Sequence, residues 1–178
     1  MPADALLLGL GNPILGDDAI GLVLAAAVGE RLSGSGDLER LELIDDCSAG
    51  GLELLEPLAG RERVFLVDAI VTGRAAPGTL HRFTAGALPP TRRLAGPHDA
   101  DLATALALGR RLGMDLPPDE AIAIYAVEIE PANEFRATLT PDLQRVAPAL
   151  ADAIARDVRA AMAELPAVSA TSRPPSAR

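Results

Sequence analysis

Aromatic residues and cysteine are scarce in this chain of 178 residues. It contains no Trp, one Tyr and three Phe, so it has few aromatic faces on which nucleic-acid bases could stack. Its core must therefore be built from Leu, Val, Ile and Ala. The one cysteine, Cys47, cannot form an internal disulfide bond, and this favours a reducing cytoplasm as its location.

Positive charge is also in short supply. Sixteen basic residues stand against 25 acidic ones, and the resulting formal charge of −9 would repel phosphate backbones and anionic membrane surfaces. The first apolar run, Ala5 to Leu10, is too short for a signal peptide core or a membrane span, and no basic segment precedes it. We therefore expect no nucleic-acid partner and no membrane insertion.

Several common catalytic and nucleotide-binding motifs are absent. The turn around Gly9, Gly11 and Gly16 fails the dinucleotide pattern because Ile14 occupies the position of the third glycine. No GK[ST] or G-x-S-x-G sequence occurs, which excludes a phosphate-binding P-loop and a serine hydrolase elbow. The sequence DDCSAGG places the Cys47 thiol beside acids rather than the cations that activate a nucleophilic thiol.

Hydrophobic periodicity predicts strands and helices in alternation. Continuous apolar runs at 5–10, 64–67 and 121–127 are typical of strands buried on both faces, and 41–44 and 79–83 are weaker strands. Helices are predicted at about 18–32, ended by Gly34 and Gly36, at about 48–58 with Ser48 as N-cap, and at about 99–112. This order predicts a three-layer α/β/α sandwich around a twisted, mostly parallel five-stranded sheet.

The last helix has the clearest sequence signals. Thr140 followed by Pro141 predicts an N-cap with proline at the first helical position, and Pro148 should kink the helix near its start. Its buried stripe is predicted to contain Leu143, Val146, Leu150, Ile154, Val158 and Met162. Residues 1–165 are thus expected to form a single α/β domain, and 166–178, rich in Pro, Ser and Arg, a disordered tail.

Acidic residues gather where the predicted strands end. In open sheets of this kind, ligands bind outside the carboxyl ends of the strands. Asp68 is the most informative of these acids, because it interrupts the apolar run VFLVDAIV and a buried carboxylate is costly unless it is compensated. The group consists of Asn12, Asp17 and Asp18 after the first strand, Asp45 and Asp46 after the second, and Asp68 at the end of the third.

Each of these acids also has a purely structural explanation. Asp68 could cap a nearby loop, and Asp17 and Asp18 could be acids at a helix start that are favoured by the helix macrodipole. The macrodipole explains one member of the pair Asp17 and Asp18 more readily than both. The alternative for Asp18 and Asp68 is that they bind a metal ion.

The chain has two histidines, and they differ in context. His81 lies beside Arg82 in an alternating strand and is expected on the surface. His98, in AGPHDADLATAL, lies between a Pro/Gly loop and a helix start, where it could cap the helix, lie in solvent or point into a crevice. Together with Asp18 and Asp68, its imidazole would complete an oxygen and nitrogen donor set that suits Ni²⁺ or Zn²⁺ with positions left open.

Five segments together resemble a known family. LGLGNPILGDDAIG, DDCSAGGLELL, VFLVDAI, APGTLHRF and GPHDADLATAL occur in the order and approximate spacing of the hydrogenase maturation endopeptidases. These cytoplasmic enzymes remove a C-terminal extension from the large subunit of [NiFe] hydrogenases. The resemblance covers Leu6 to Ala163, which is nearly the whole chain outside the predicted tail.

The resemblance implies a set of site residues and a substrate. By motif position, Asp18, Asp68 and His98 are the residues that contact nickel and act in catalysis, and Asp17 is left to support the helix start, although the choice between Asp17 and Asp18 stays open. The resemblance further implies that nickel arrives in the large-subunit precursor. Either that nickel or a recruited zinc ion would polarise the scissile carbonyl, with a carboxylate as base.

Two alternative functions remain open from the sequence. GLGNP also resembles the opening of peptidyl-tRNA hydrolase, an esterase, but that family continues with a tyrosine and a catalytic histidine where this chain has Ile14, no tyrosine and Ile20. A non-catalytic nickel-binding factor for hydrogenase assembly would use the same three ligands without hydrolysis.

Overall fold

A computed structural model describes residues 3–33, 39–47, 51–87, 102–131 and 135–166. The strands are β1 (Ala5–Leu10), β2 (Leu41–Cys47), β3 (Arg63–Ile70), β4 (Leu80–Thr84) and β5 (Ile122–Glu128). The α-helices are α1 (Ile20–Leu32), α2 (Leu55–Leu58), α3 (Leu102–Arg111) and α4 (Pro141–Ala163). Short 3₁₀ turns include η1 (Gly16–Ala19) before α1 and η3 (Gly51–Leu54) before α2.

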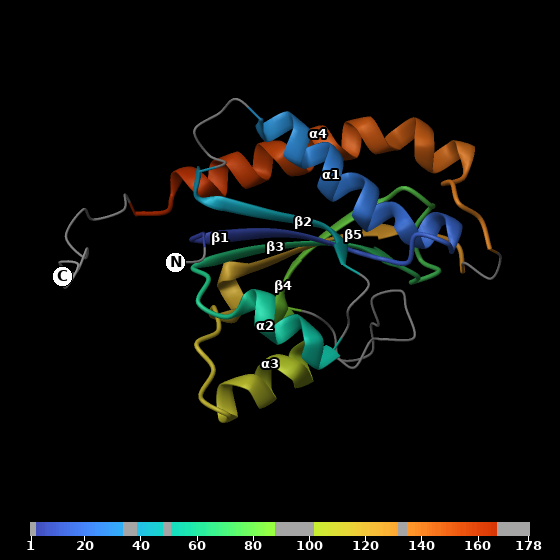
Figure 1. The fold of residues 1–178 in the computed structure, drawn as a ribbon. Coiled ribbons are helices and arrows are strands. Elements are labelled where there is room, and N and C mark those ends of the chain that lie inside the picture. The colour runs from blue at the N-terminus through green and yellow to red at the C-terminus, as the bar shows by residue number, and fades with distance from the viewer. Residues whose placement is uncertain (1–2, 34–38, 48–50, 88–101, 132–134, 167–178) are drawn as a thin grey trace, which may run out of the picture.

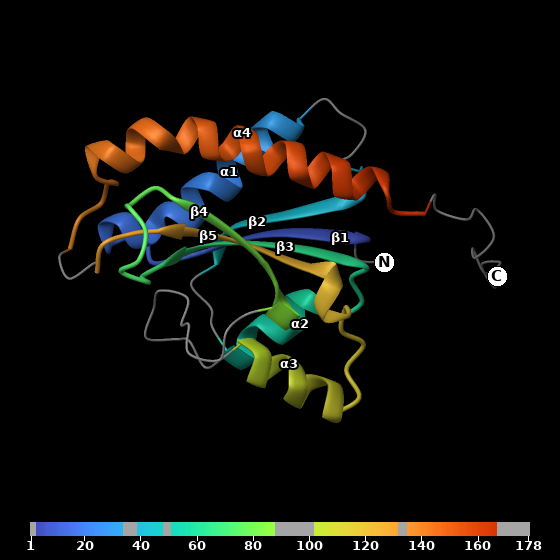
Figure 2. The same ribbon diagram turned by 180° about the vertical axis from the view of Figure 1, so that it is seen from behind.

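The five strands form one sheet in the order β2-β1-β3-β5-β4, in which β4 is antiparallel to its neighbour and the other pairs are parallel. Helices α1 and α4 cover one face of the sheet, and α2 and α3 cover the other (Figures 1 and 2). The predicted three-layer α/β/α sandwich with a mostly parallel sheet is confirmed.

The two layers of core reflect the alternation of side chains along the strands. Phe65 and Val67 of β3 pack with α1 and α4, whereas Leu66 and Ile70 of the same strand pack with α2 and α3. Phe65 is the only aromatic residue among the large side chains that are fully buried, so aliphatic residues do fill most of the core, as the composition predicts.

The predicted elements agree with the observed ones apart from their ends. The five strands and α1, α3 and α4 occur where they are predicted, and α4 begins at Pro141 after Thr140 and continues through Pro148. The second helix is shorter than predicted, because the described chain forms a 3₁₀ turn first and has Pro57 inside its single α-helical turn. Asp45 and Asp46 lie inside β2 rather than after it.

Some predictions concern residues outside the described ranges. These are the helix-ending glycines Gly34 and Gly36, the N-cap Ser48, the start of the third helix at Asp99, and the tail from 167 onward. No helix in the described part of the chain is both long enough and apolar enough to span a membrane.

The topology marks one position at the carboxyl edge of the sheet. The chain leaves β1 toward the face covered by α1, and after β3 it leads by way of β4 to α3 on the opposite face. Crevices form where neighbouring parallel strands send their connections to opposite faces, and ligands bind there. That position lies between the ends of β1 and β3, at the end of the sheet where α1 begins (Figure 1).

Glycines allow α1 to begin in direct contact with these two strands. A Cβ atom on Gly21 would lie 2.2 Å from the Leu10 carbonyl oxygen, 2.4 Å from the Val67 carbonyl oxygen and 2.9 Å from the Cα atom of Asp68. On Gly9 of β1, a Cβ atom would lie 2.8 Å from the Gly21 carbonyl oxygen. Any larger residue at Gly21 must therefore push the start of α1 away from the strand ends.

We expect Gly21→Ala to lower the free energy of unfolding by about 1–3 kcal/mol, as overpacked cores do, because its obstacles are backbone atoms. Gly29→Ala in the same helix is the matched control, since the atom in its way is a methyl group of Leu43, 2.5 Å away, which can rotate. Alanine also favours a helix over glycine by about 1 kcal/mol. Urea unfolding of both variants checks the prediction, and equal losses of stability would contradict it.

Candidate functional site

The turn between β1 and α1 carries Asp18 in a buried position. Asp18 is 6% exposed, and its Oδ2 atom accepts a hydrogen bond from the backbone N–H of Asn12 at 3.0 Å. The side chain of Asn12 accepts the N–H of Ile14 at 3.2 Å, and its carbonyl accepts the N–H of Leu15. These bonds close the turn on itself and help to hold the Asp18 carboxylate in place.

The hydrogen-bond partner of Asp17 is a residue far along the chain, Thr140. Its Oδ1 atom accepts the backbone N–H of Thr140 at 2.6 Å, and its Oδ2 atom accepts the Thr140 hydroxyl at 3.0 Å. Thr140 is the N-cap residue of α4. Asp17 lies in the first turn of η1, where an acid at the helix start is predicted, and its side chain also bonds to the start of α4, 123 residues further along the chain.

Asp68 lies on β3 and is 4% exposed, which agrees with its prediction as a buried acid. The strand continues for two residues beyond it, to Ile70, so Asp68 lies near the strand end and not at it. Its Oδ1 atom accepts the N–H of Ala69 at 2.7 Å. Pairing of β3 with β1 stops at Val67, whereas pairing with β5 continues to Ile70, so Asp68 is the first residue of β3 beyond its pairing with β1.

The fold brings the segments that carry these two acids together. The 3₁₀ turn η1, which carries Asp17 and Asp18, contacts β3, which carries Asp68. Gly21, three residues after Asp18, lies against the backbone of Asp68. Asp18 and Asp68 are two of only four polar or charged residues that are buried within the described ranges, the others being Arg61 and Glu128.

The third predicted site residue, His98, lies outside the residues that the structure describes. Within the described ranges, no three His, Cys, Asp or Glu side chains form a group that could hold a metal ion. A set made of Asp18, Asp68 and one further donor from elsewhere in the chain is compatible with this result. The predicted metal site thus stays a prediction, and two of its three members lie at the same strand ends.

A second polar cluster, which the sequence analysis missed, lies at the same edge of the sheet. Glu128, at the end of β5, is 1% exposed and accepts bonds from the Thr72 N–H at 2.7 Å, the Thr72 hydroxyl at 2.7 Å and the Gly73 N–H at 2.9 Å. The Nε2 atom of His81 lies 3.0 Å from its Oε2 atom. Glu128 therefore ties the loop after β3 to the ends of β4 and β5.

The prediction that His81 lies on the surface is wrong. Its side chain is only 21% exposed, because it lies on the same face of the sheet as Glu128 and is stacked on Phe83 with ring centroids 6.0 Å apart. Strand alternation explains this difference. His81 is paired with Ala126, and so it shares the face on which α2 and α3 pack.

The hydrogen bonds to Glu128 also control its charge. Burial would raise the pKa of this carboxyl, but the bonds from Thr72, Gly73 and His81 outweigh burial and hold its pKa below the ordinary value of 4.5. A sequence signal for this residue does exist. Glu128 ends the apolar run AIYAV in the same way that Asp68 interrupts VFLVDAIV, so the rule that singled out Asp68 applies to it as well.

Comparison with known proteins identifies the family to which this sequence is similar. The model of the hydrogenase maturation protease family matches residues 26–157, a range that includes β2 to β5 and begins after Asp18. The hydrogenase 2 maturation protease of Escherichia coli K12 is 30% identical over 151 residues, which cover 82% of this chain and 89% of that protein.

Solved structures show the same fold. The hydrogenase maturating endopeptidase HybD from E. coli superposes with a TM-score of 0.69 at 26% identity, covering 90% of this chain and 93% of that one. The [NiFe] hydrogenase maturation protease HybD from Thermococcus kodakarensis gives a TM-score of 0.62 at 20% identity, covering 89% and 99%. At that lower identity the second match supports the fold alone.

The Glu128 cluster generates a prediction about pH. A carboxyl whose pKa is lowered on folding stabilises the protein above its ordinary pKa, and this contribution is lost as the pH falls through the lowered value. We expect Glu128→Gln to lower the free energy of unfolding by about 1–3 kcal/mol at neutral pH, because bonds to a charged acceptor are lost. The difference from the unsubstituted protein should be full at neutral pH and should shrink as the pH falls below the ordinary carboxyl pKa of 4.5.

Glu130→Gln provides the control for this experiment, since Glu130 is exposed and only two residues away. Urea unfolding across the pH range measures both variants. A pH-independent effect of Glu128→Gln would show that packing, and not the charge, accounts for the contribution of Glu128.

Proposed function

This chain belongs to the hydrogenase maturation protease family and is an endopeptidase of hydrogenase maturation, and on this premise we propose that it cleaves the C-terminal extension of a nickel-loaded [NiFe] hydrogenase large-subunit precursor. The observation that carries the proposal is the pair of buried carboxylates, Asp18 and Asp68, on segments in contact at the carboxyl edge of the sheet. Carboxylate oxygens are ligands for divalent metal ions, and we propose that this pair contacts a cation brought by the substrate.

His98 is proposed as the third member of the site. Two carboxylates and an imidazole match the donor preferences of nickel or zinc, and three protein ligands leave positions for a substrate group. In this proposal Asp18, Asp68 and His98 contact the nickel of the precursor, or a zinc ion, and the metal supplies Lewis acidity toward the scissile carbonyl. One of the carboxylates takes the proton of the attacking water.

The surface around this site supports a protein as substrate. Seven large hydrophobic side chains are exposed in the described part of the chain, and four of them follow the four parallel strands at their carboxyl edge. Exposed apolar side chains that gather on one side of a protein are typical of interaction surfaces. These four, here called the apolar rim, are Ile14 after β1, Leu52 after β2, Val71 after β3 and Phe135 after β5.

Charge and composition are consistent with this partner. The formal charge of −9 disfavours nucleic acid, which also weakens the case for a peptidyl-tRNA hydrolase. The single cysteine suits the reducing cytoplasm in which we propose that the precursor is processed. A non-catalytic nickel-binding factor would bind the precursor through the same residues but leave its length unchanged.

We expect Asp68→Asn and His98→Ala each to abolish processing of the nickel-loaded precursor. Removing a proposed ligand weakens the contact with the metal, and Asp68→Asn leaves the size of the side chain unchanged, so the apolar core of the fold should persist. Incubation of each variant with the precursor, followed by electrophoresis of the large subunit, measures the change in length, and circular dichroism checks the fold. Normal processing by either folded variant would overturn the site assignment.

Cys47→Ser is the matched control in this assay, because Cys47 is half-buried at the end of β2 on the same edge of the sheet. This variant should process the precursor normally, and total loss of activity would instead point to a thiol mechanism. If the unsubstituted protein bound the precursor and left it uncut, the assembly factor would be the correct function.

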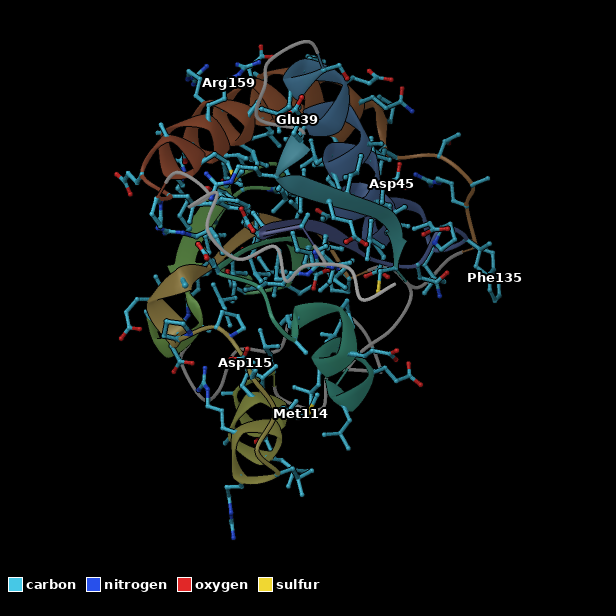
Figure 3. The ribbon with its side chains drawn as sticks, turned by 60° about the vertical axis from the view of Figure 1, so that its left-hand side comes forward. Glu39, Asp45, Met114, Asp115, Phe135 and Arg159 are labelled. Atoms are coloured by element: carbon cyan, nitrogen blue, oxygen red, sulfur yellow. The ribbon has the colours of Figure 1, made fainter. Side chains whose placement is uncertain are left out.

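The apolar rim generates a second prediction. Phe135 is 84% exposed and points away from the body of the protein (Figure 3). We expect Phe135→Ser to raise the KM for the precursor by roughly tenfold, the equivalent of about 1.4 kcal/mol of contact, with stability and kcat unchanged. Steady-state processing at varied precursor concentration measures the effect.

Leu112→Ser is the control for Phe135→Ser. Leu112 is also strongly exposed, at 71%, but it lies at the opposite edge of the sheet, where the Asp115 carbonyl accepts the N–H of Gly60 ahead of β3. The KM of Leu112→Ser for the precursor should match that of the unsubstituted protein. Equal KM values for the two variants would exclude the apolar rim from the docking surface.

A further inference from the structure

Asp17 makes a contact that its position in the sequence does not explain. Both of its carboxylate oxygens accept hydrogen bonds from the same residue, Thr140, one from the backbone N–H and one from the hydroxyl. The Thr140 side chain makes no capping bond within its own helix. The Asp17 carboxylate therefore bonds to the N-cap residue of α4, as the acidic side chain of a capping box does, at a helix start where the macrodipole favours a negative charge.

Backbone bonds beside Asp17 strengthen the same connection. The N–H of Gly16 donates to the Arg136 carbonyl at 2.7 Å, and the N–H of Arg136 donates to the Ile14 carbonyl at 3.0 Å. Leu15 and Arg136 form an isolated parallel bridge between the same segments. The turn is thus fastened to residues 136–140 along its length, and α4 in turn packs against α1.

Asp18, the next residue, bonds to a different part of the chain. Asp17 and Asp18 lie in the 3₁₀ turn η1, in which successive side chains point about 120° apart because three residues complete one turn. While Asp17 reaches α4, Asp18 is buried and accepts the N–H of Asn12. Neighbouring acids of the same type therefore have separate partners.

We propose that Asp17 is a positioning residue, which by binding Thr140 at the start of α4 fixes the orientation of the turn that carries Asp18 against β3, the strand of Asp68. The proposal rests on the function proposed above. Asp17 touches neither the metal nor the substrate in this account. It keeps the turn from rotating about its connections to β1 and α1, and a small misplacement of a site residue lowers the rate strongly.

Three variants separate positioning from general stabilisation. Asp17→Ala removes both hydrogen bonds to Thr140. Asp17→Asn keeps them, since its Oδ1 atom can accept the Thr140 N–H and its Nδ2 group can donate to the Thr140 hydroxyl. Asp152→Ala removes the α4 carboxylate that pairs with Arg31 near the far end of α1, and so it weakens a different connection between α1 and α4.

The first readout is the processing of the nickel-loaded precursor. We expect Asp17→Ala to lower kcat by roughly 10- to 100-fold with KM unchanged, because misplacement of a site residue affects the rate more than docking. Asp17→Asn should restore kcat to within about threefold of the unsubstituted protein, since the geometry is kept. Asp152→Ala should leave kcat unchanged.

The second readout needs neither metal nor precursor. The N–H groups of Asn12 and Ala69 bond to the carboxylates of Asp18 and Asp68 respectively, so their exchange with solvent, followed by NMR, reports the order of each site residue. We expect Asp17→Ala to speed exchange at Asn12 by about tenfold or more and to leave Ala69 unchanged. If Asp17→Ala fails to fold, Thr140→Val, which removes only the hydroxyl bond, should show a smaller change in the same direction.

Two outcomes would overturn the positioning role. The first is that Asp17→Ala, or Thr140→Val where Asp17→Ala does not fold, changes neither kcat nor the exchange rate of the Asn12 N–H. The second is that Asp152→Ala changes kcat and the Asn12 exchange rate as much as Asp17→Ala does. If the unsubstituted protein does not cut the precursor but Asn12 exchange responds as expected, the proposed function fails and the positioning role stands.

Discussion

The direct contact between the start of α1 and the ends of β1 and β3 is the constraint on which the candidate site depends. A helix that follows a parallel strand normally stands off from the sheet by the size of its side chains. Here Gly9 and Gly21 remove those side chains at the point of contact, and the backbone of α1 meets the carbonyls of Leu10 and Val67. Asp18 enters the edge of the sheet because its helix begins so close to β3.

The sheet topology explains why the contact occurs at this place. Connections leave β1 and β3 toward opposite faces, so the strand ends separate and leave room for the turn 11–19 between them. Pairing of β1 with β3 ends before Asp68, and the polar turn then continues beside β3. Two carboxylates, those of Asp18 and Asp68, are thereby enclosed at the border of an otherwise aliphatic core.

Two other acids hold this border in place by binding backbone N–H groups. Asp17 fastens the turn after β1 to the start of α4, and Glu128 fastens the loop after β3 to the end of β5. Each carboxylate also accepts a threonine hydroxyl, from Thr140 or Thr72. The acidity of this edge thus serves two purposes: some carboxylates shape the loops, and we propose that Asp18 and Asp68 bind the metal.

An acid that interrupts an apolar run was a sufficient sequence signal to select Asp68 in β3. The same rule, applied to the apolar run of β5, would have selected Glu128. Histidine was harder to judge. His81 belongs to a short strand whose face is set by its pairing with Ala126, and the alternation of five residues does not say which face meets the helices. The surface assignment of His81 failed for that reason.

The sequence by itself determined the order of strands and helices, the aliphatic core and the acids at the strand ends, because these follow from local periodicity and from the cost of burying charge. Only the tertiary structure decided which of two adjacent aspartates faces which neighbour. Asp17 and Asp18 are chemically identical, and their difference lies in Thr140 and Asn12, partners 123 and 6 residues away. Contacts across such a separation depend on how the chain folds back on itself, which no local pattern of residues records.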